Sequence, residues 1–273
     1  EIWPRDWSSD VCSSDLLNKT FYFLEDGRCF IVREETSTGY MHLYLYGIGQ
    51  GVLHPITQGE WEVTDFVGLR GDKVYYISTE SSPLKRDLYR VGLDGKHKER
   101  LTPGDGYYSI YPSADLSYYI CEGGDSSAPG RTDVFNAAGK RVRTLYDNAP
   151  LKEALVEAGL PVREFFTFTT ERGDELNGYM LKPLDFDPAK RYPVLLTQYS
   201  GPGSQQVAEG WGPDWEDALV THGYIVVCVD PRGTGYRGEE FKKLTYGNLG
   251  RLEVEDQIST ARYMARQSYV DPA

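Results

Sequence analysis

The chain has 273 residues, of which 40% are hydrophobic and 13% aromatic, so it can form one large or two ordinary packed domains. Its formal net charge of −12 argues against nucleic acid or an anionic membrane surface as a partner, because both would be repelled. The four cysteines and four histidines lack CxxC, HExxH or other paired spacings, so we expect no metal site, and no apolar run reaches the roughly 18 residues of a membrane helix.

The first 16 residues do not follow the pattern of a folded segment. A Ser-Ser-Asp unit occurs twice between Trp7 and Leu16, five residues apart, which matches neither the strand nor the helix period. The stretch resembles translated sequencing-adapter sequence, and a natural Ser/Asp-rich tail is the alternative. We therefore expect residues 1–16 to be a non-native or disordered extension.

Residues 17–149 are a series of short, aromatic-rich runs separated by Gly, Pro, Asp and Ser, which is typical of an all-β protein. Asp-Gly lies between candidate strands in FLEDGRCF and GLDGKH, and this dipeptide is the strongest short-range signal for a hairpin. Four positions recur with a common offset of 45 residues, although coincidence among common residue types is the alternative. The matching pairs are Leu43 and Leu88, Tyr44 and Tyr89, Thr57 and Thr102, and Gly59 and Gly104. A repeat of about 40 to 50 residues in an all-β segment predicts four-stranded propeller blades, here two or three at the end of a larger ring.

After Asp147 the pattern changes to apolar strands that alternate with helices. In chain order we expect a linker helix at 150–159, a hairpin at 163–183, strands at 192–200 and 224–230 that flank a helix at 213–223, and a long helix at 251–267. Strands that are apolar throughout and alternate with helices predict a parallel sheet covered on both faces. The expected fold class is therefore an all-β region followed by an α/β region.

Charged residues in the second half have structural interpretations. Residues 230–238, DPRGTGYRG, lack the Lys-Ser/Thr ending of a phosphate loop and the GxGxxG spacing of a dinucleotide site. We interpret them as a turn in which Arg232 pairs locally with carboxylates, and we expect no cofactor. Glu253, Glu255 and Asp256 begin the last helix, where acidic residues more often cap the helix and stay solvated than bind a metal.

Three segments in the second half carry the pattern of a known family. They are KRYPVLLTQYSGPGSQ at 190–205, VVCVDPRGTGYRGEEF at 226–241 and LGRLEVEDQISTARYM at 249–264. Together with the preceding GEWEV and VYYIS strands, they make the chain from about Phe21 to Ala273 resemble the dipeptidyl peptidase IV branch of the prolyl oligopeptidase family. The resemblance implies a multi-domain protein, with the C-terminal blades of a β-propeller at residues 17–149 and the N-terminal part of an α/β-hydrolase (peptidase) domain at residues 150–273.

The resemblance also implies a function. Such enzymes are serine exopeptidases that release N-terminal dipeptides, with proline or alanine in the second position, from peptides with a free N-terminus. Family members often form homodimers and are usually extracytoplasmic, either periplasmic or secreted. Two alternatives stay open: an oligopeptidase or acylaminoacyl peptidase of the same family, and a non-catalytic homologue that uses both folds as an interaction scaffold.

Two site residues follow from the resemblance. In the family, the tyrosine before Gly-Pro places its hydroxyl in the oxyanion hole, and that position is Tyr199 here. A phenol held there can donate a hydrogen bond to the charge that develops on the attacked carbonyl oxygen, whereas a core tyrosine with a satisfied hydroxyl is the alternative. Phe23 is implied to line the substrate pocket from the propeller side, although an aromatic residue on a strand is more often part of the core.

The sequence lacks the nucleophile that this chemistry requires. A serine hydrolase of this fold carries its serine in a GxSxG elbow, followed in sequence by an acid and a histidine, and no GxSxG occurs here. The final residues, YVDPA, are typical of a helix end and a turn into the next strand. We therefore expect the catalytic Ser, Asp and His, and the substrate-binding glutamates of the family, to lie outside this chain, which would be inactive alone. His222 is interpreted as a structural cap at a helix end.

Overall fold

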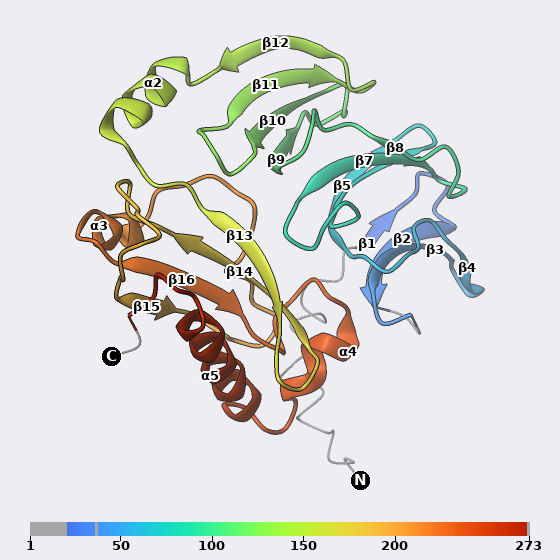
Figure 1. Cartoon of the computed structure of the whole chain (residues 1–273). Helices are drawn as coiled ribbons and strands as arrows, with labels where there is room; N and C mark the ends of the chain where they lie inside the picture. The colour runs from blue at the N-terminus through green and yellow to red at the C-terminus, as the bar shows by residue number, and fades with distance from the viewer. Residues whose placement is uncertain (1–20, 36–37, 272–273) are drawn as a thin grey trace.

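The computed structural model describes residues 21–35 and 38–271 of the chain. The extension predicted at residues 1–16 lies outside these ranges. Within them the chain forms four sheets of four strands each, and Figure 1 shows three of these sheets in an arc beside the fourth. No described helix is both long enough and apolar enough to span a membrane.

The first three sheets are antiparallel meanders, in which each strand pairs with its neighbours in sequence. The first sheet contains β1 (Phe21–Phe23), β2 (Cys29–Glu35), β3 (Met41–Gly47) and β4 (Gly51–Pro55). The second contains β5 (Val63–Arg70), β6 (Lys73–Ser78), β7 (Asp87–Gly92) and β8 (Glu99–Arg100). The third contains β9 (Tyr107–Pro112), β10 (Tyr118–Gly124), β11 (Arg131–Asn136) and β12 (Arg141–Tyr146). This up-and-down order in four-stranded sheets is consistent with propeller blades.

The second sheet is packed on both of its faces. Side chains alternate along β6, so Val74 and Tyr76 belong to the core shared with the first sheet, whereas Tyr75 packs in the core shared with the third. Tyr76 has no exposed surface, and its ring stacks on that of Tyr89 with the centroids 5.7 Å apart. Two aromatic-rich cores therefore lie between the three sheets, which explains the density of tyrosine in this half of the sequence.

The 45-residue repeat coincides with the first two sheets. β3 and β7 are the third strands of their sheets, and His42 and Asp87 occupy equivalent, fully buried positions on them. Nδ1 of His42 lies 3.1 Å from Oγ1 of Thr57, and Oγ1 of Thr102 donates to Oδ1 of Asp87 at 2.6 Å. In each sheet a threonine beyond the fourth strand thus bonds to the third strand, so the repeat has a structural cause.

The fourth sheet has the order β13-β14-β16-β15, so its last two strands do not follow the chain order. Its strands are β13 (Glu164–Thr169), β14 (Glu175–Leu181), β15 (Val194–Thr197) and β16 (Ile225–Asp230). β15 and β16 pair in parallel, as predicted for the apolar strands that alternate with helices, and β13 and β14 form the predicted hairpin. The sheet as a whole is mixed and not parallel, because β14 pairs with β16 in the antiparallel direction. The buried strand predicted at 192–200 is shorter and half-exposed, because β15 lies at the edge of the described sheet.

Helices cover both faces of the fourth sheet, as predicted. The two helices that pack on its faces are α3 (Trp215–Thr221) and α5 (Arg251–Ala265). The other helices are α2 (Ala149–Ala158) and α4 (Glu239–Lys242), with a short 3-10 turn, η2, at Lys243–Thr245. Along β16, Val227 shares a core with Met264 of α5, and Val226 shares another with Val220 of α3, because successive side chains point to opposite faces. Helix α2 differs from α3 and α5 in that it has no buried residue.

Candidate functional site

Tyr199 lies at the carboxyl end of β15 in a segment that we call the Tyr199 loop (residues 198–207). Its side chain is 69% exposed, and among the described residues its hydroxyl has no hydrogen-bond partner, so it is not a core tyrosine. Ser200 has a left-handed backbone, with φ 58°, and a Cβ at Gly201 would lie 2.5 Å from Cε1 of Tyr199. Glycine at position 201 therefore leaves the space that the phenol ring occupies.

The turn that follows β16 holds the Tyr199 loop through its backbone. The amide of Gly203 donates to the carbonyl oxygen of Gly233 at 2.8 Å, and the amide of Gly235 donates to that of Ser204 at 2.9 Å. A Cβ at Gly235 would lie 2.6 Å from the carbonyl oxygen of Gly203. The two backbones approach this closely because position 235 has no side chain.

Asp230, the last residue of β16, holds the far end of the same loop. Its carboxylate accepts hydrogen bonds from the amides of Gln206 and Val207 at 2.9 Å each, and only 7% of Asp230 is exposed. Burial raises the pKa of Asp230, whereas the two amide hydrogen bonds favour its charged form. The Tyr199 loop is thus held at several points by the neighbouring strand and its turn.

Arg232 forms ion pairs, as predicted, but its main partner is not local. Its Nη2 donates to Oδ1 of Asp256 at 2.6 Å, and its Nη1 lies 3.0 Å from Oδ2 of Asp174. Asp256 has no exposed surface, so the prediction that it stays solvated is wrong: its carboxylate balances a buried cation. Glu253 does cap α5, since its carboxylate accepts from the amide of Gly250 at 2.9 Å.

Arg86 joins the second sheet to the Tyr199 loop. It is only 4% exposed, and its Nη2 donates to Oε1 of Gln205 at 2.6 Å. Its guanidinium carbon lies 3.9 Å from the ring centroid of Tyr236 and 5.3 Å from that of Tyr107, so the cation is stacked on aromatic faces. Nothing in the sequence around Arg86 separates it from an ordinary surface arginine, and our sequence analysis missed it.

Two further contacts connect the first sheets to the segment after β16. The amide of Gly238 donates to Oε1 of Glu62 at 2.9 Å, and Glu62 is buried. Nζ of Lys242, on α4, lies 2.5 Å from Oε1 of Glu35, on β2. Glu62, which directly precedes β5, and Glu35 of β2 therefore contact the backbone and a helix lysine of the segment that follows β16.

A cavity of about 740 Å³ lies between the antiparallel sheets and these loops. Its lining includes charged side chains of both signs, namely Arg33, Glu35, Glu62, Asp65, Arg86 and Lys242. Tyr107 and Tyr236 add aromatic surface, and Gly203 and Gly235 contribute backbone from the loops near Tyr199. The volume is within the usual range for small-ligand sites, and a mixed polar and aromatic lining suits a peptide backbone.

The structure does not bring the two predicted site residues together. Phe23 is 63% exposed on β1 and packs against Phe30, with the ring centroids 5.5 Å apart, and it is not in the lining of the cavity described above. Tyr199 borders a separate hollow of about 540 Å³, which it shares with Val254 and Ile258 of α5.

His222 ends α3, as predicted, with its ring Nδ1 2.7 Å from the carbonyl oxygen of Ala218. Across residues 21–35 and 38–271, no three His, Cys, Asp or Glu side chains are grouped so that they could hold a metal ion.

The sheets and loops together define a class of protein. Three blade-like sheets precede a mixed sheet that is consistent with the start of an α/β-hydrolase. The Tyr199 loop, which follows β15 of the mixed sheet, contacts the second blade-like sheet through the hydrogen bond between Arg86 and Gln205. The family described as "Dipeptidyl peptidase IV (DPP IV) N-terminal region" matches residues 8–129, and the "Prolyl oligopeptidase family" matches residues 211–273. These matches confirm the resemblance seen in the sequence to the dipeptidyl peptidase IV branch of the prolyl oligopeptidase family.

Relatives and solved structures agree with this assignment. A probable dipeptidyl peptidase 4 of Emericella nidulans is 37% identical over 245 residues, which cover 86% of this chain and 31% of that protein. A dipeptidyl peptidase 4 of Arthroderma otae is 32% identical over 280 residues, which cover 99% of this chain and 36% of that protein. The crystal structure of Porphyromonas gingivalis dipeptidyl peptidase 4 is 39% identical with a TM-score of 0.86, over 92% of this chain and 36% of that one.

A putative dipeptidyl aminopeptidase IV from Bacteroides ovatus is 25% identical with a TM-score of 0.81, over 92% of this chain and 39% of that one. The chain therefore spans about a third of the length of the relatives that it matches.

Proposed function

We propose that these residues are part of a serine exopeptidase of the dipeptidyl peptidase IV type. It would release N-terminal dipeptides, with proline or alanine in the second position, from peptides with a free N-terminus. The observation that carries the proposal is the exposed phenol of Tyr199 on a loop held by Asp230 and by backbone hydrogen bonds. The loop follows the carboxyl end of a parallel strand, where α/β folds place their ligands.

In this proposal, Tyr199 is the oxyanion donor. A hydrogen-bond donor is most effective when its position is fixed before charge develops, because no reorganisation is then needed in the transition state. The contacts of the Tyr199 loop support such a fixed position. A free hydroxyl is also required, because a phenol already bonded within the protein could not donate to the substrate.

The edge of the fourth sheet supports the proposed place of the nucleophile. Val270 forms a parallel bridge with Tyr192, and the amide of Asp271 donates to the carbonyl oxygen of Tyr192 at 2.9 Å. A strand continuing from Val270 would pair with the exposed edge of β15 and end beside the Tyr199 loop. We propose that the elbow serine follows this strand, since GxSxG is absent from the 273 residues themselves.

The cavity of about 740 Å³ is the proposed path for the peptide substrate. We propose that residues 17–149 supply the propeller side of this path and residues 150–273 the start of the peptidase domain. Phe23 is exposed but does not line this cavity, so its contact with substrate from the propeller side is proposed from the family alone. A homodimer and an extracytoplasmic location are proposed from the family alone.

The test is made on the whole protein to which these residues belong, with a Gly-Pro-p-nitroanilide substrate. The Tyr199→Phe variant keeps the ring and removes the donor, so kcat should fall by about 10²–10³-fold with a small change in KM. Tyr224→Phe is the matched control, because Tyr224 is also exposed but directly precedes β16, at the end of that strand away from the Tyr199 loop. This variant should retain activity within twofold. An unchanged kcat in Tyr199→Phe would contradict the proposed role.

A further inference from the structure

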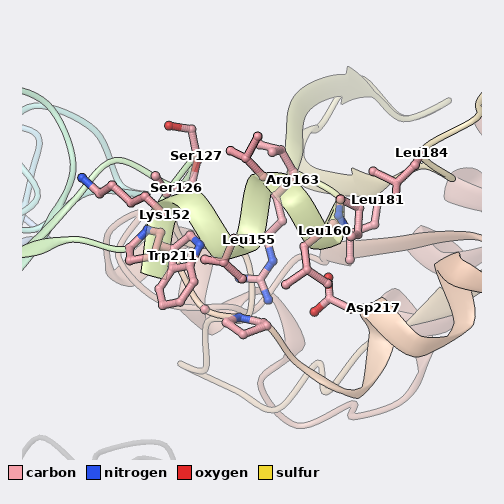
Figure 2. A pocket seen from close by; sticks show the side chains of 18 of the residues that line it. Ser126, Ser127, Lys152, Leu155, Leu160, Arg163, Leu181, Leu184, Trp211 and Asp217 are labelled. Carbon is pink, nitrogen blue, oxygen red and sulfur yellow. The ribbon is translucent and has the colours of Figure 1, made fainter. Parts of the chain in front are cut away.

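A second pocket, of about 310 Å³, lies against helix α2 (Figure 2). Four segments besides α2 contribute to its walls, namely residues 126–129, 159–163, 181–184 and 210–217. The first belongs to the loop between β10 and β11 of the third sheet, and the other three belong to the part of the chain that forms the fourth sheet. A molecule bound here would therefore touch both regions and the helix that connects them.

The apolar part of this pocket is incompletely packed. Helix α2 carries Leu151, Leu155 and Val156, yet none of its residues is buried, and Val156 is 82% exposed. A helix in a globular protein normally buries its apolar side against a core. Leu155 lines the open pocket instead, opposite Trp211 and beside Leu160. The hydrophobic surface under α2 is thus available to an apolar group of a ligand.

Two cations in the lining are not held by a direct ion pair, although the pKa of Asp125 is lowered by hydrogen bonds from Ser127 and also by the charge of Lys152. Within the described residues, neither Arg163 nor Lys152 forms an ion pair, and the guanidinium of Arg163 is stacked 4.6 Å from the ring centroid of Tyr179. Figure 2 shows Arg163 projecting into the pocket between Trp211 and Asp217. The Asp217 carboxylate also lines the pocket, and its Oδ2 accepts from the amide of Asp214 at 2.6 Å in the capping box of α3.

We propose that this pocket binds a small apolar carboxylate. Its hydrophobic group would lie under α2 against Leu155 and Trp211, and its carboxylate would accept hydrogen bonds from the planar fork of Arg163, with Lys152 adding positive charge. A guanidinium recognises a carboxylate through paired, charge-assisted hydrogen bonds. The proposal is independent of the peptidase function, since none of these four residues lines the cavity proposed for the peptide or the hollow beside Tyr199.

The test uses the whole protein to which these residues belong and two probes with the same phenylbutyl skeleton, the anion 4-phenylbutyrate and the neutral alcohol 4-phenylbutanol. Binding is followed by tryptophan fluorescence, and the signal from Trp211 is identified with the Trp211→Phe variant. The carboxylate should bind in a saturable manner and about tenfold more tightly than the alcohol. In Arg163→Gln the carboxylate should lose that advantage, whereas alcohol binding should be unchanged, which shows that the pocket is intact.

Lys190→Gln is the matched control, because it removes an exposed cation outside the pocket and should change neither affinity. Equal binding of the two probes would show an unfilled apolar gap and overturn the proposal. So would absence of saturable binding, or carboxylate binding that is unaffected in Arg163→Gln.

Discussion

Arg86 allows a direct measurement of how strongly the second sheet holds the Tyr199 loop. In Arg86→Met the side chain keeps its length but loses three hydrogen bonds, to the carbonyl oxygens of Pro83 and Lys85 and to Oε1 of Gln205, as well as its contact with Tyr236. Hydrogen bonds from a charged donor contribute about 1.5–3 kcal/mol each, and they are not additive. Part of this loss is offset because a buried cation no longer has to be desolvated. We expect the free energy of unfolding to fall by about 3 kcal/mol.

The assay is urea unfolding of the chain, followed by tryptophan fluorescence and circular dichroism. Arg172→Met is the matched control, because the Arg172 side chain is 57% exposed and its ion pair contributes at most about 1 kcal/mol. Combining Arg86→Met with Gln205→Ala should reveal a coupling of about 1 kcal/mol or more. If Arg86→Met unfolds within about 0.5 kcal/mol of the wild type, or if the two changes are additive, the proposed link between sheet and loop is wrong.

Three other results are expected. Asp256→Asn should lower the free energy of unfolding by about 3–5 kcal/mol, because it removes the fully buried charge partner of Arg232 and leaves only the partly exposed Asp174 and Glu255. Glu253→Gln, at the cap of the same helix, should cost about 1 kcal/mol or less in the same urea assay. Burial lowers the pKa of His42 below its ordinary value near 6.5. The contribution of neutral His42 to stability is therefore complete above about pH 6.5 and is lost as the pH falls through the pKa of the folded state. A His42→Gln variant should show a smaller loss of stability than the wild type between about pH 6.5 and 5. Burial also raises the pKa of Cys121 and of Cys228 to about 12, so both thiols should react with a thiol reagent at pH 8 only after unfolding. Mass spectrometry locates the labelled cysteine, and labelling of either one in the native chain would contradict the packing described here.

Local patterns in the sequence were enough to predict most elements. The Asp-Gly hairpins, the apolar run of β16 and the capped helix α3 each depend on residues within a few positions of one another, and they form where expected. The 45-residue repeat reflects one hydrogen bond in each of the first two sheets, between a threonine beyond the fourth strand and a residue of the third strand 15 positions earlier. What local patterns did not predict is that the hairpin joins the same sheet as the parallel strands, with β14 antiparallel to β16.

The sequence by itself determined the alternation of strands and helices, the family and the position of Tyr199 before its glycine-rich turn. The tertiary structure alone decided that Tyr199 is exposed, that Asp256 is buried against Arg232, and that Arg86 contacts Gln205, 119 positions later in the chain. The reason is physical: secondary structure follows from interactions among near neighbours, whereas the burial and partner of a charged group depend on segments that only folding brings together. A charged residue in a turn or at a helix start has the same local sequence pattern whether water or a buried counter-charge surrounds it.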